Sequence, residues 1–189
     1  MPRSNKTKQL LAKSLKELMA TTPLEKISIN DIVEHAGVGR NTFYYHFQDK
    51  YDLVNWYFQI GATHFLVEQS CYSNWQAVLS SIEGYFQENK AFYTNALQYT
   101  GQNSLQEYIY NFIKTFLAQR LSERCPGIDD AETRFIVNFI AGGVVSVLNT
   151  WVQDGMPDQA EDRNASTLAM TSGDLIKILL DESPSAPIS

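Results

Sequence analysis

The sequence is poor in the residues that build metal centres, disulfide frameworks and most active sites. It holds three histidines and two cysteines, Cys71 and Cys125, which lie far apart in the chain. Two isolated cysteines give neither a disulfide framework nor a zinc-ligand pattern, so no metal or other cofactor is expected and a reducing cytoplasm is the simplest setting. A phosphate-binding loop, a dinucleotide-binding glycine motif and an HExxH motif are all absent. The sequence therefore predicts that the protein is not an enzyme.

Long apolar runs and strand-like alternation are also missing. No apolar run approaches the roughly 20 residues that span a bilayer, and the basic, amphipathic first residues lack the apolar core of a secretory signal. Apolar residues make up 44% of the chain, and they recur with the 3.6-residue period of helices rather than the two-residue period of strands. The predicted fold is all-α, with about nine helices and no membrane contact.

The net charge of −6 is unevenly distributed. Residues 1–50 hold eight Lys and Arg against five Asp and Glu, a balance of +3, and the remaining residues balance to −9. An acidic protein with a basic first quarter is suited to touching phosphates with one end. Ordinary variation of surface charge explains this swing equally well when it is taken alone.

Apolar spacing and capping residues divide the chain into predicted elements and domains. A first helix covers about residues 5–21, and a second begins after an N-cap at Ser28 or Asn30 and ends at Gly37. We expect residues 1–50 to form a three-helix helix-turn-helix domain, residues 51–181 a larger helical regulatory and dimerisation domain, and residues 182–189 a disordered tail. The other predicted helices cover about residues 39–47, 50–69, 74–88, 90–99, 105–124, 130–153 and 160–180.

The most informative segment is INDIVEHAGVGRNTFYYHFQDK, residues 29–50. Gly37 supplies the positive φ of a sharp turn between two short helices, and the second helix is rich in hydrogen-bond donors. A helix enters the DNA major groove by its N-terminal residues, where Arg40 can pair with guanine and Asn41 with adenine. Thr42 can meet a phosphate or a thymine methyl group. The predicted phosphate donors beside the groove are Ser28, Tyr44, Tyr45, His46 and Lys50.

Two of these residues have plain structural alternatives. His46, which follows two tyrosines, is instead a stacked structural aromatic in one interpretation. Lys50 pairs with a nearby carboxylate in another. The combination of turn glycine, apolar plug, donor-rich short helix and following long helix favours DNA binding over these alternatives.

Residues 42–53, TFYYHFQDKYDL, resemble the T-x-Y-x-[HY]-F-x-[DN]-K-x-x-L signature of the TetR family of bacterial transcription regulators. The resemblance covers about residues 5–55 and includes Gly37 and Val38, with Val33 as a departure where the family commonly has alanine. It implies base contacts from the start of the second helix and phosphate contacts around it. The implied base-contacting residues are Arg40, Asn41, Thr42, Tyr45 and, as in some members, Asn30; the implied phosphate contacts are Ser28, Tyr44, His46 and Lys50.

The segment 139–148 is apolar nearly all round its predicted helix and contains small residues that permit close helix approach. We interpret it, with the last helix, as the seam of a homodimer, although a core within one chain is the alternative. In a two-fold dimer, reading helices about 34–36 Å apart would match a palindromic operator. The predicted interface residues are Phe139, Gly142, Gly143, Val147, Trp151, Leu168, Leu175 and Leu179.

Aromatic residues are frequent between the predicted helix-turn-helix domain and the predicted dimer segment. They could line an effector cavity, although aromatics at helical spacing more often form core. The region around residues 74–104 resembles the C-terminal type of dihydroxyacetone kinase operon regulators, some of which are activators switched by a protein co-activator. The effector is thus an unknown small molecule or a protein co-regulator. The candidate ligand-binding residues are Trp56, Phe65, Tyr85, Phe86, Phe92, Tyr93, Tyr108 and Phe112.

The leading hypothesis is a dimeric, sequence-specific regulator of transcription that binds double-stranded DNA and is controlled through its C-terminal domain. The alternative keeps the fold but makes the protein an architectural or cell-cycle DNA-binding protein, governed by a protein partner without a small-molecule effector.

Overall fold

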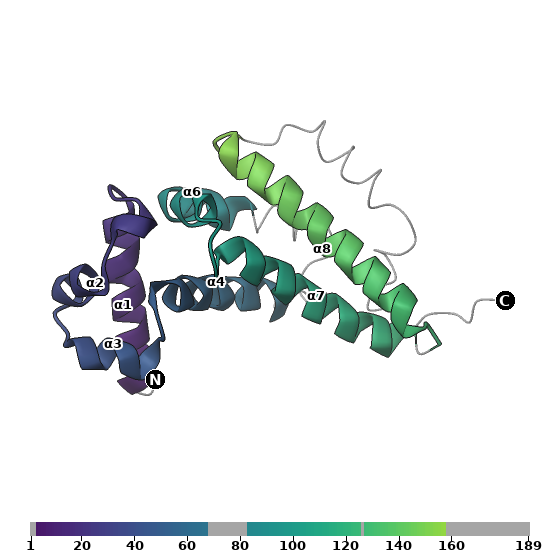
Figure 1. The fold of residues 1–189 in the computed structure, drawn as a ribbon, viewed down its shortest axis with the longest axis horizontal. Coiled ribbons are helices and arrows are strands. Elements are labelled where there is room, and N and C mark those ends of the chain that lie inside the picture. Colours follow the sequence, from purple (N-terminus) through teal and green to yellow (C-terminus); the bar gives the residue numbers. More distant parts are fainter. Residues whose placement is uncertain (1–2, 68–82, 126, 158–189) are drawn as a thin grey trace. The chain divides into compact units, whose positions relative to one another are not determined.

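The computed structural model describes residues 3–67, 83–125 and 127–157, and within these ranges the regular structure is entirely helical (Figure 1). The predicted all-α class is confirmed. Residues 83–88 are helical, whereas the rest of the predicted fifth helix, the predicted helix over 160–180 and the predicted tail 182–189 lie outside the described residues. The labelled elements are α1 (Arg3–Met19), η1 (Leu24–Lys26), α2 (Ile29–Ala36), α3 (Arg40–His46), α4 (Lys50–Val67), α6 (Lys90–Gln98), α7 (Leu105–Arg124) and α8 (Asp130–Gln153).

The chain divides into two compact units, Met1–Tyr108 and Ile109–Ser189. The first unit joins the three-helix head to α4 and α6, so packing continues past residue 50. The predicted division between residues 1–50 and 51–181 stays a prediction about function.

Side-chain caps lie at the N-terminal ends of α4 and α8, where the predicted and observed helix starts agree. The Asp129 carboxylate accepts the N–H groups of Ala131 at 2.7 Å and Glu132 at 2.8 Å, and these bonds begin α8. At the start of α4, Asp49 accepts the N–H of Asp52 at 2.8 Å. Such bonds satisfy N–H groups that have no partner inside the helix.

The head is built on a small apolar core between α1, α2 and α3. Leu11, Leu15 and Ile32 are almost completely buried there, and Phe43 contributes the inward side of α3. α2 lies against α1, and α3 follows near the N-terminal end of α1 (Figure 1). This arrangement leaves the opposite side of α3 without a covering element in the head.

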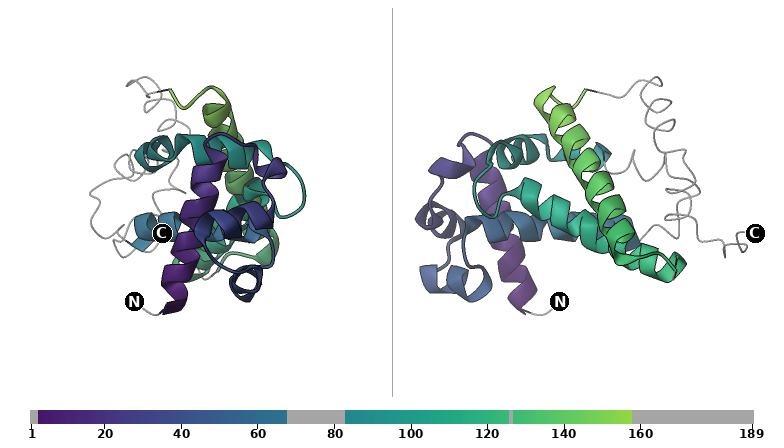
Figure 2. Two further views of the ribbon diagram at one scale, coloured as in Figure 1. Left: turned by 90° about the vertical axis from the view of Figure 1, so that its left-hand side faces the viewer. Right: turned by 45° about the vertical axis from the view of Figure 1, so that its right-hand side comes forward.

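In the second unit, α7 packs against α8 (Figure 2). The shared core is centred on Leu117, Leu121 and Val137. The Tyr110 hydroxyl adds a hydrogen bond to Oδ1 of Asn138 at 2.9 Å. Among the described residues, α8 alone is long and apolar enough to cross a membrane by length and composition, a test that core helices of soluble proteins also pass.

We predict that Gly37→Ala destabilises the protein by about 1–2 kcal/mol, because Gly37 has φ +65° and side chains disfavour this left-handed conformation. An added Cβ meets no atom within 4 Å, so the cost is conformational and not steric. Urea unfolding at fixed protein concentration measures it. Gly39→Ala is the matched control because Gly39 has φ −80°; equal losses in the two variants would contradict the assignment of the cost to the turn.

Candidate DNA-binding interface

The start of α2 is closed by a reciprocal cap. The Ser28 hydroxyl accepts the N–H of Asp31 at 3.2 Å, and the Asp31 carboxylate accepts the Ser28 N–H at 2.8 Å. Asp31 also accepts the Ser28 hydroxyl proton at 2.8 Å. These hydrogen bonds, first the backbone one and then the hydroxyl one, hold the pKa of Asp31 below its usual range. Asn30, the other predicted cap, is exposed and does not serve as the cap.

The turn from α2 to α3 has the predicted left-handed glycine. Gly37 has φ +65° and ψ 33°. The N–H of Val38 then donates to the carbonyl of Val33 at 3.0 Å, which satisfies a carbonyl at the end of α2. The bond brings half-buried Val38 back under the helix pair, so the turn fixes the direction in which α3 leaves.

α3 buries one side and exposes the other. Phe43 and Phe47 are 0% and 3% exposed, whereas Tyr45 is 82% exposed and Tyr44 47%. This confirms the predicted inward phenylalanines and outward tyrosines. An exposed tyrosine offers a hydroxyl and a flat apolar ring to a partner. The remaining predicted residues of α3 divide into exposed Arg40 and Asn41 and half-buried Thr42 and His46.

Two ring contacts organise the exposed surface of α3. The Arg40 guanidinium lies 5.6 Å from the Tyr44 ring centre and donates to the Tyr44 hydroxyl at 3.2 Å. The other guanidinium N–H groups of Arg40 can donate to acceptors on a partner. The His46 ring meets Tyr45 edge-on at 4.9 Å. This contact agrees with the structural alternative for His46 and leaves its proposed phosphate contact a prediction.

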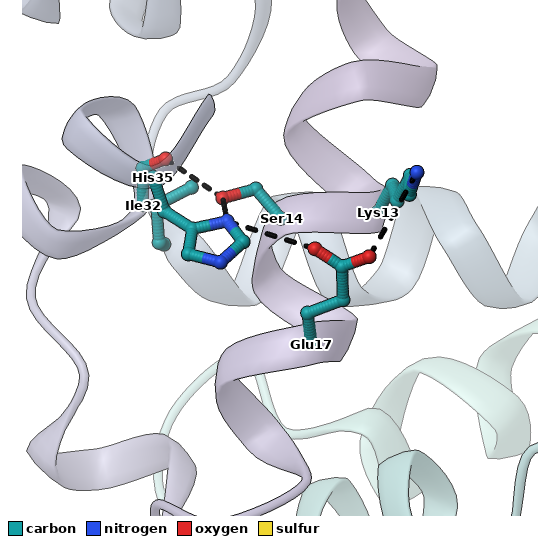
Figure 3. A network of polar contacts seen from close by, with 5 residues as sticks. All are labelled: Lys13, Ser14, Glu17, Ile32 and His35. Carbon is teal, nitrogen blue, oxygen red and sulfur yellow. Dashed lines mark hydrogen bonds and ion pairs between the residues drawn. The ribbon is translucent and has the colours of Figure 1, made fainter. Parts of the chain in front are cut away.

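A buried serine joins α1 to α2 behind this surface (Figure 3). The Ser14 hydroxyl donates to the Ile32 carbonyl at 2.9 Å and lies 3.0 Å from Nδ1 of His35. Its single proton is used on the carbonyl, so His35 must donate from Nδ1. Glu17 lies 3.7 Å from the same nitrogen. This network holds the second half of α2 on α1.

The structure corrects the role predicted for Lys50. Its ammonium group donates to the carbonyls of Leu24 at 2.7 Å, Glu25 at 2.9 Å and Ile27 at 2.8 Å. An ammonium group has three protons, so none is left for a phosphate in this conformation. Its partial burial lowers its pKa below the usual value. The partners are backbone carbonyls rather than the carboxylate of the alternative interpretation, and Lys50 is an anchor of η1. Ser28 is likewise occupied by its cap.

The aromatic residues predicted to line an effector site largely pack on one another. Phe86 stacks on Tyr93 with ring centres 4.0 Å apart, and Phe92 meets Tyr93 edge-on at 5.2 Å. These three side chains are at most 3% exposed. Burial raises the pKa of Tyr85 to about 12 and that of Tyr93 further. This part of the predicted site is therefore apolar core.

The remaining candidate ligand residues lie in other surroundings. Trp56 packs on Phe47 at 5.7 Å and under the Lys8 ammonium, so it belongs with the head and not with the aromatic cluster. Tyr108 meets Phe58 edge-on at 6.1 Å. Phe112 is half-buried in the second unit, and the side chain of Phe65 lies outside the described part.

α8 presents an apolar face that none of the described helices covers. Phe135 and Phe139 are 70% and 74% exposed and stack on each other, and Val147 is 55% exposed. Gly142 and Gly143 lie between them, with nothing within 4 Å of an added Cβ. Trp151, also predicted for this face, is instead 3% exposed, and its indole N–H donates to the Pro157 carbonyl. The other predicted interface residues, Leu168, Leu175 and Leu179, lie outside the described residues.

Asn95 of α6, which no motif marks, makes three hydrogen bonds to backbone groups around the end of α1. Its amide nitrogen donates to the carbonyls of Met19 at 3.0 Å and Thr22 at 2.7 Å, and its oxygen accepts the Leu24 N–H at 2.7 Å. A sequence signal did exist: Asn95 precedes buried Ala96 and Leu97, so it is a polar residue beside the apolar stripe of its helix.

Two protein families match the chain. The family described as bacterial regulatory proteins, tetR family, matches residues 12–56, and the one described as transcriptional regulator C-terminal region matches residues 73–173. The chain is 30% identical over 173 residues to the HTH-type transcriptional regulator SAR2658 of Staphylococcus aureus. This match covers 84% of each protein. The chain therefore belongs to the TetR family of bacterial transcription regulators.

Other relatives share parts of the sequence or the fold. The chain is 34% identical over 93 residues to DhaS of Lactococcus lactis subsp. lactis, the HTH-type dhaKLM operon transcriptional activator; the match spans 49% of this chain and 50% of that protein. The solved structure of a DhaS has a TM-score of 0.54 at 22% identity, covering 92% of this chain and 94% of that one. NalD of Pseudomonas aeruginosa has a TM-score of 0.55 at 18% identity, covering 96% and 99%. These structures share the fold.

We predict that Lys50→Met lowers the free energy of unfolding by about 1–3 kcal/mol, because it removes the ammonium donor from the carbonyls of Leu24, Glu25 and Ile27. The urea midpoint measures the loss. Lys26→Met removes the same charge from an exposed residue of η1 and is the matched control. Unchanged stability in Lys50→Met, together with weaker DNA binding, would restore the phosphate role.

Proposed function

We propose that this TetR-family regulator is a cytoplasmic homodimer that binds a palindromic operator with α3 in the major groove. One observation carries the proposal: α3 buries Phe43 and Phe47 and turns exposed, donor-bearing side chains away from the head. A helix that enters the major groove must present exposed hydrogen-bond donors in this way. The basic balance of residues 1–50 gives this end the sign that phosphates attract.

The proposed contacts follow position along α3. Arg40 and Asn41, exposed in its first turn, can pair with guanine and adenine edges, and Thr42 lies beside them. Tyr45, which is 82% exposed, is proposed to reach a base or the sugar-phosphate backbone. The proposed flanking contacts are Asn30 at the start of α2 and Tyr44 and His46 on α3. Ser28 and Lys50 use their donors on the cap of α2 and on backbone carbonyls, so neither is included.

The dimer proposal rests on the exposed face of α8. Phe135 and Phe139 would cost free energy if they stayed in water, and small Gly142 and Gly143 let another helix approach closely. A second copy of α8 packed across a two-fold axis covers the same face on both chains. Two copies of α3 then read two half-sites.

Control through the C-terminal domain is part of the proposal, and its agent is a small-molecule effector or a protein co-regulator. The mutual packing of Phe86, Phe92 and Tyr93 favours the second candidate, in which a protein partner governs DNA binding. Opening a site there for a small molecule means separating rings that are already in contact. The alternative of an architectural DNA-binding protein shares this feature, and a sharply sequence-specific operator would argue against it.

We predict that Arg40→Ala weakens binding to the preferred operator by about 1–3 kcal/mol and relaxes choice at one base pair, because a bidentate guanine contact is lost. Selection from a random duplex pool supplies the operator, and titration at one salt concentration gives both affinities. Arg120→Ala removes the same charge from α7 and serves as control. Parent-like selectivity in Arg40→Ala would refute the reading role.

We predict that Phe139→Glu converts the dimer to a monomer, because it places a charge in an apolar seam. Sedimentation equilibrium measures the molar mass. Val144→Glu is the control on the same helix: Val144 is 44% exposed and lies about 140° around the helix from Phe139. A monomeric parent protein, or a dimeric Phe139→Glu variant, would refute the proposed seam.

A further inference from the structure

Leu24, the first residue of η1, is held through its N–H and its C=O by two different helices. Its N–H donates to Oδ1 of Asn95 on α6 at 2.7 Å, and its carbonyl accepts from Nζ of Lys50 on α4 at 2.7 Å. The Leu24 side chain is 2% exposed, so it is fixed in the core as well. A displacement of α6 relative to α4 must therefore act on Leu24.

The other side of Asn95 closes the end of α1. Its amide nitrogen donates to the carbonyls of Met19, the last residue of α1, and of Thr22, both of which precede Asn95 by more than 70 residues. Carbonyls at a helix end lack partners within their own helix, so this side chain acts as a cap supplied by α6. α6 lies beside this end of α1 (Figure 1). Asn95 thus uses its oxygen and its amide donors on one short connection.

A second route leads from α6 to the same residue. Tyr99, which follows the last residue of α6, stacks on Tyr51 with ring centres 4.2 Å apart and planes 12° from parallel. The Lys50 ammonium lies 5.3 Å from the Tyr51 ring centre while it donates to Leu24. Both ends of this short helix segment therefore converge on Leu24, one directly and one through Tyr51 and Lys50.

From Leu24 the connection reaches α2 within four residues. Lys50 also holds the carbonyl of Ile27 at 2.8 Å, and Ile27 is 2% exposed. Ser28 follows at once and caps α2. Because the Gly37 turn ties α3 to α2, a displacement of η1 acts on the start of α2 and through it on α3.

We propose that η1 is a joint through which α6 sets the position of α2 and α3, and that Asn95 is the positioning residue of this joint. The part of the proposal that concerns DNA rests on the proposed function. Asn95 touches no DNA in it. It holds the α1–α2 connection in the conformation that places α3 for entry into the major groove. A partner that moves α6 would then change operator binding through Leu24.

Hydrogen exchange in the full-length protein tests the joint without DNA. Asn95→Ala should speed exchange of the Asp31 and Ile32 amides in the first turn of α2 about tenfold, because local opening becomes easier. Gln98→Ala, an exposed residue of the same helix, should leave both rates unchanged. Urea midpoints of both variants separate this local effect from global loss of stability. Unchanged α2 exchange in folded Asn95→Ala would overturn the proposal.

Asn95→Asp is the second variant, for the case in which Asn95→Ala does not fold. It keeps an oxygen for the Leu24 N–H but replaces the donor to Met19 and Thr22 by an acceptor, and the same faster α2 exchange is expected. Parent-like exchange in this variant would equally overturn the joint.

DNA titration tests whether the joint reaches α3. The ratio of operator affinity to random-duplex affinity should fall about tenfold in Asn95→Ala, because base contacts require α3 in one position whereas attraction to phosphates is independent of sequence. A parent protein without sequence preference would refute the proposed function, and the exchange experiment would still decide the joint. Discrimination that is intact in a variant with faster α2 exchange would overturn the link to α3.

Discussion

The burial of Phe43 is the contact on which the proposed DNA-binding surface of α3 depends. α3 has seven residues, too few for a helix that is stable alone in water. It is helical because Phe43 and Phe47 enter the core of the head. The same burial fixes the rotation of the helix about its axis, so Arg40 and Tyr45 have one direction left to face. Fold and site are here two results of a single packing constraint.

Much of the fold was predictable because its signals are local. The caps at Asp49 and Asp129 and the left-handed turn at Gly37 each depend on a few neighbouring residues, and helix ends were placed closely where such signals occur. α1 ends at Met19, two residues before the predicted end, where the N–H groups of Ala20 and Thr21 donate to the carbonyls of Glu17 and Leu18, three residues back instead of four. No capping side chain in the sequence marks that end.

The sequence predicted the exposed side chains of the site, but not the side chains that bind backbone groups of the same chain. The exposure of Tyr44 and Tyr45 follows from helical spacing against Phe43. The roles of Lys50 and Asn95 depend on carbonyls that the fold brings from elsewhere in the chain, and every residue has a carbonyl, so no sequence pattern marks the acceptor. Aromatic residues pose a related difficulty: composition cannot separate a ring that lines a site from one that packs on another ring, as Tyr93 does on Phe86.

The charge of Lys50 is satisfied by uncharged peptide carbonyls in a partly buried place. Dissolved ions screen attraction between exposed charges and compete for phosphates, but they weaken a sheltered hydrogen bond to a neutral dipole far less. Rising ionic strength can therefore detach the protein from a polyanion while its head keeps its shape. Release and unfolding then become separate events, and a protein freed by salt is ready to bind again as soon as the salt is diluted.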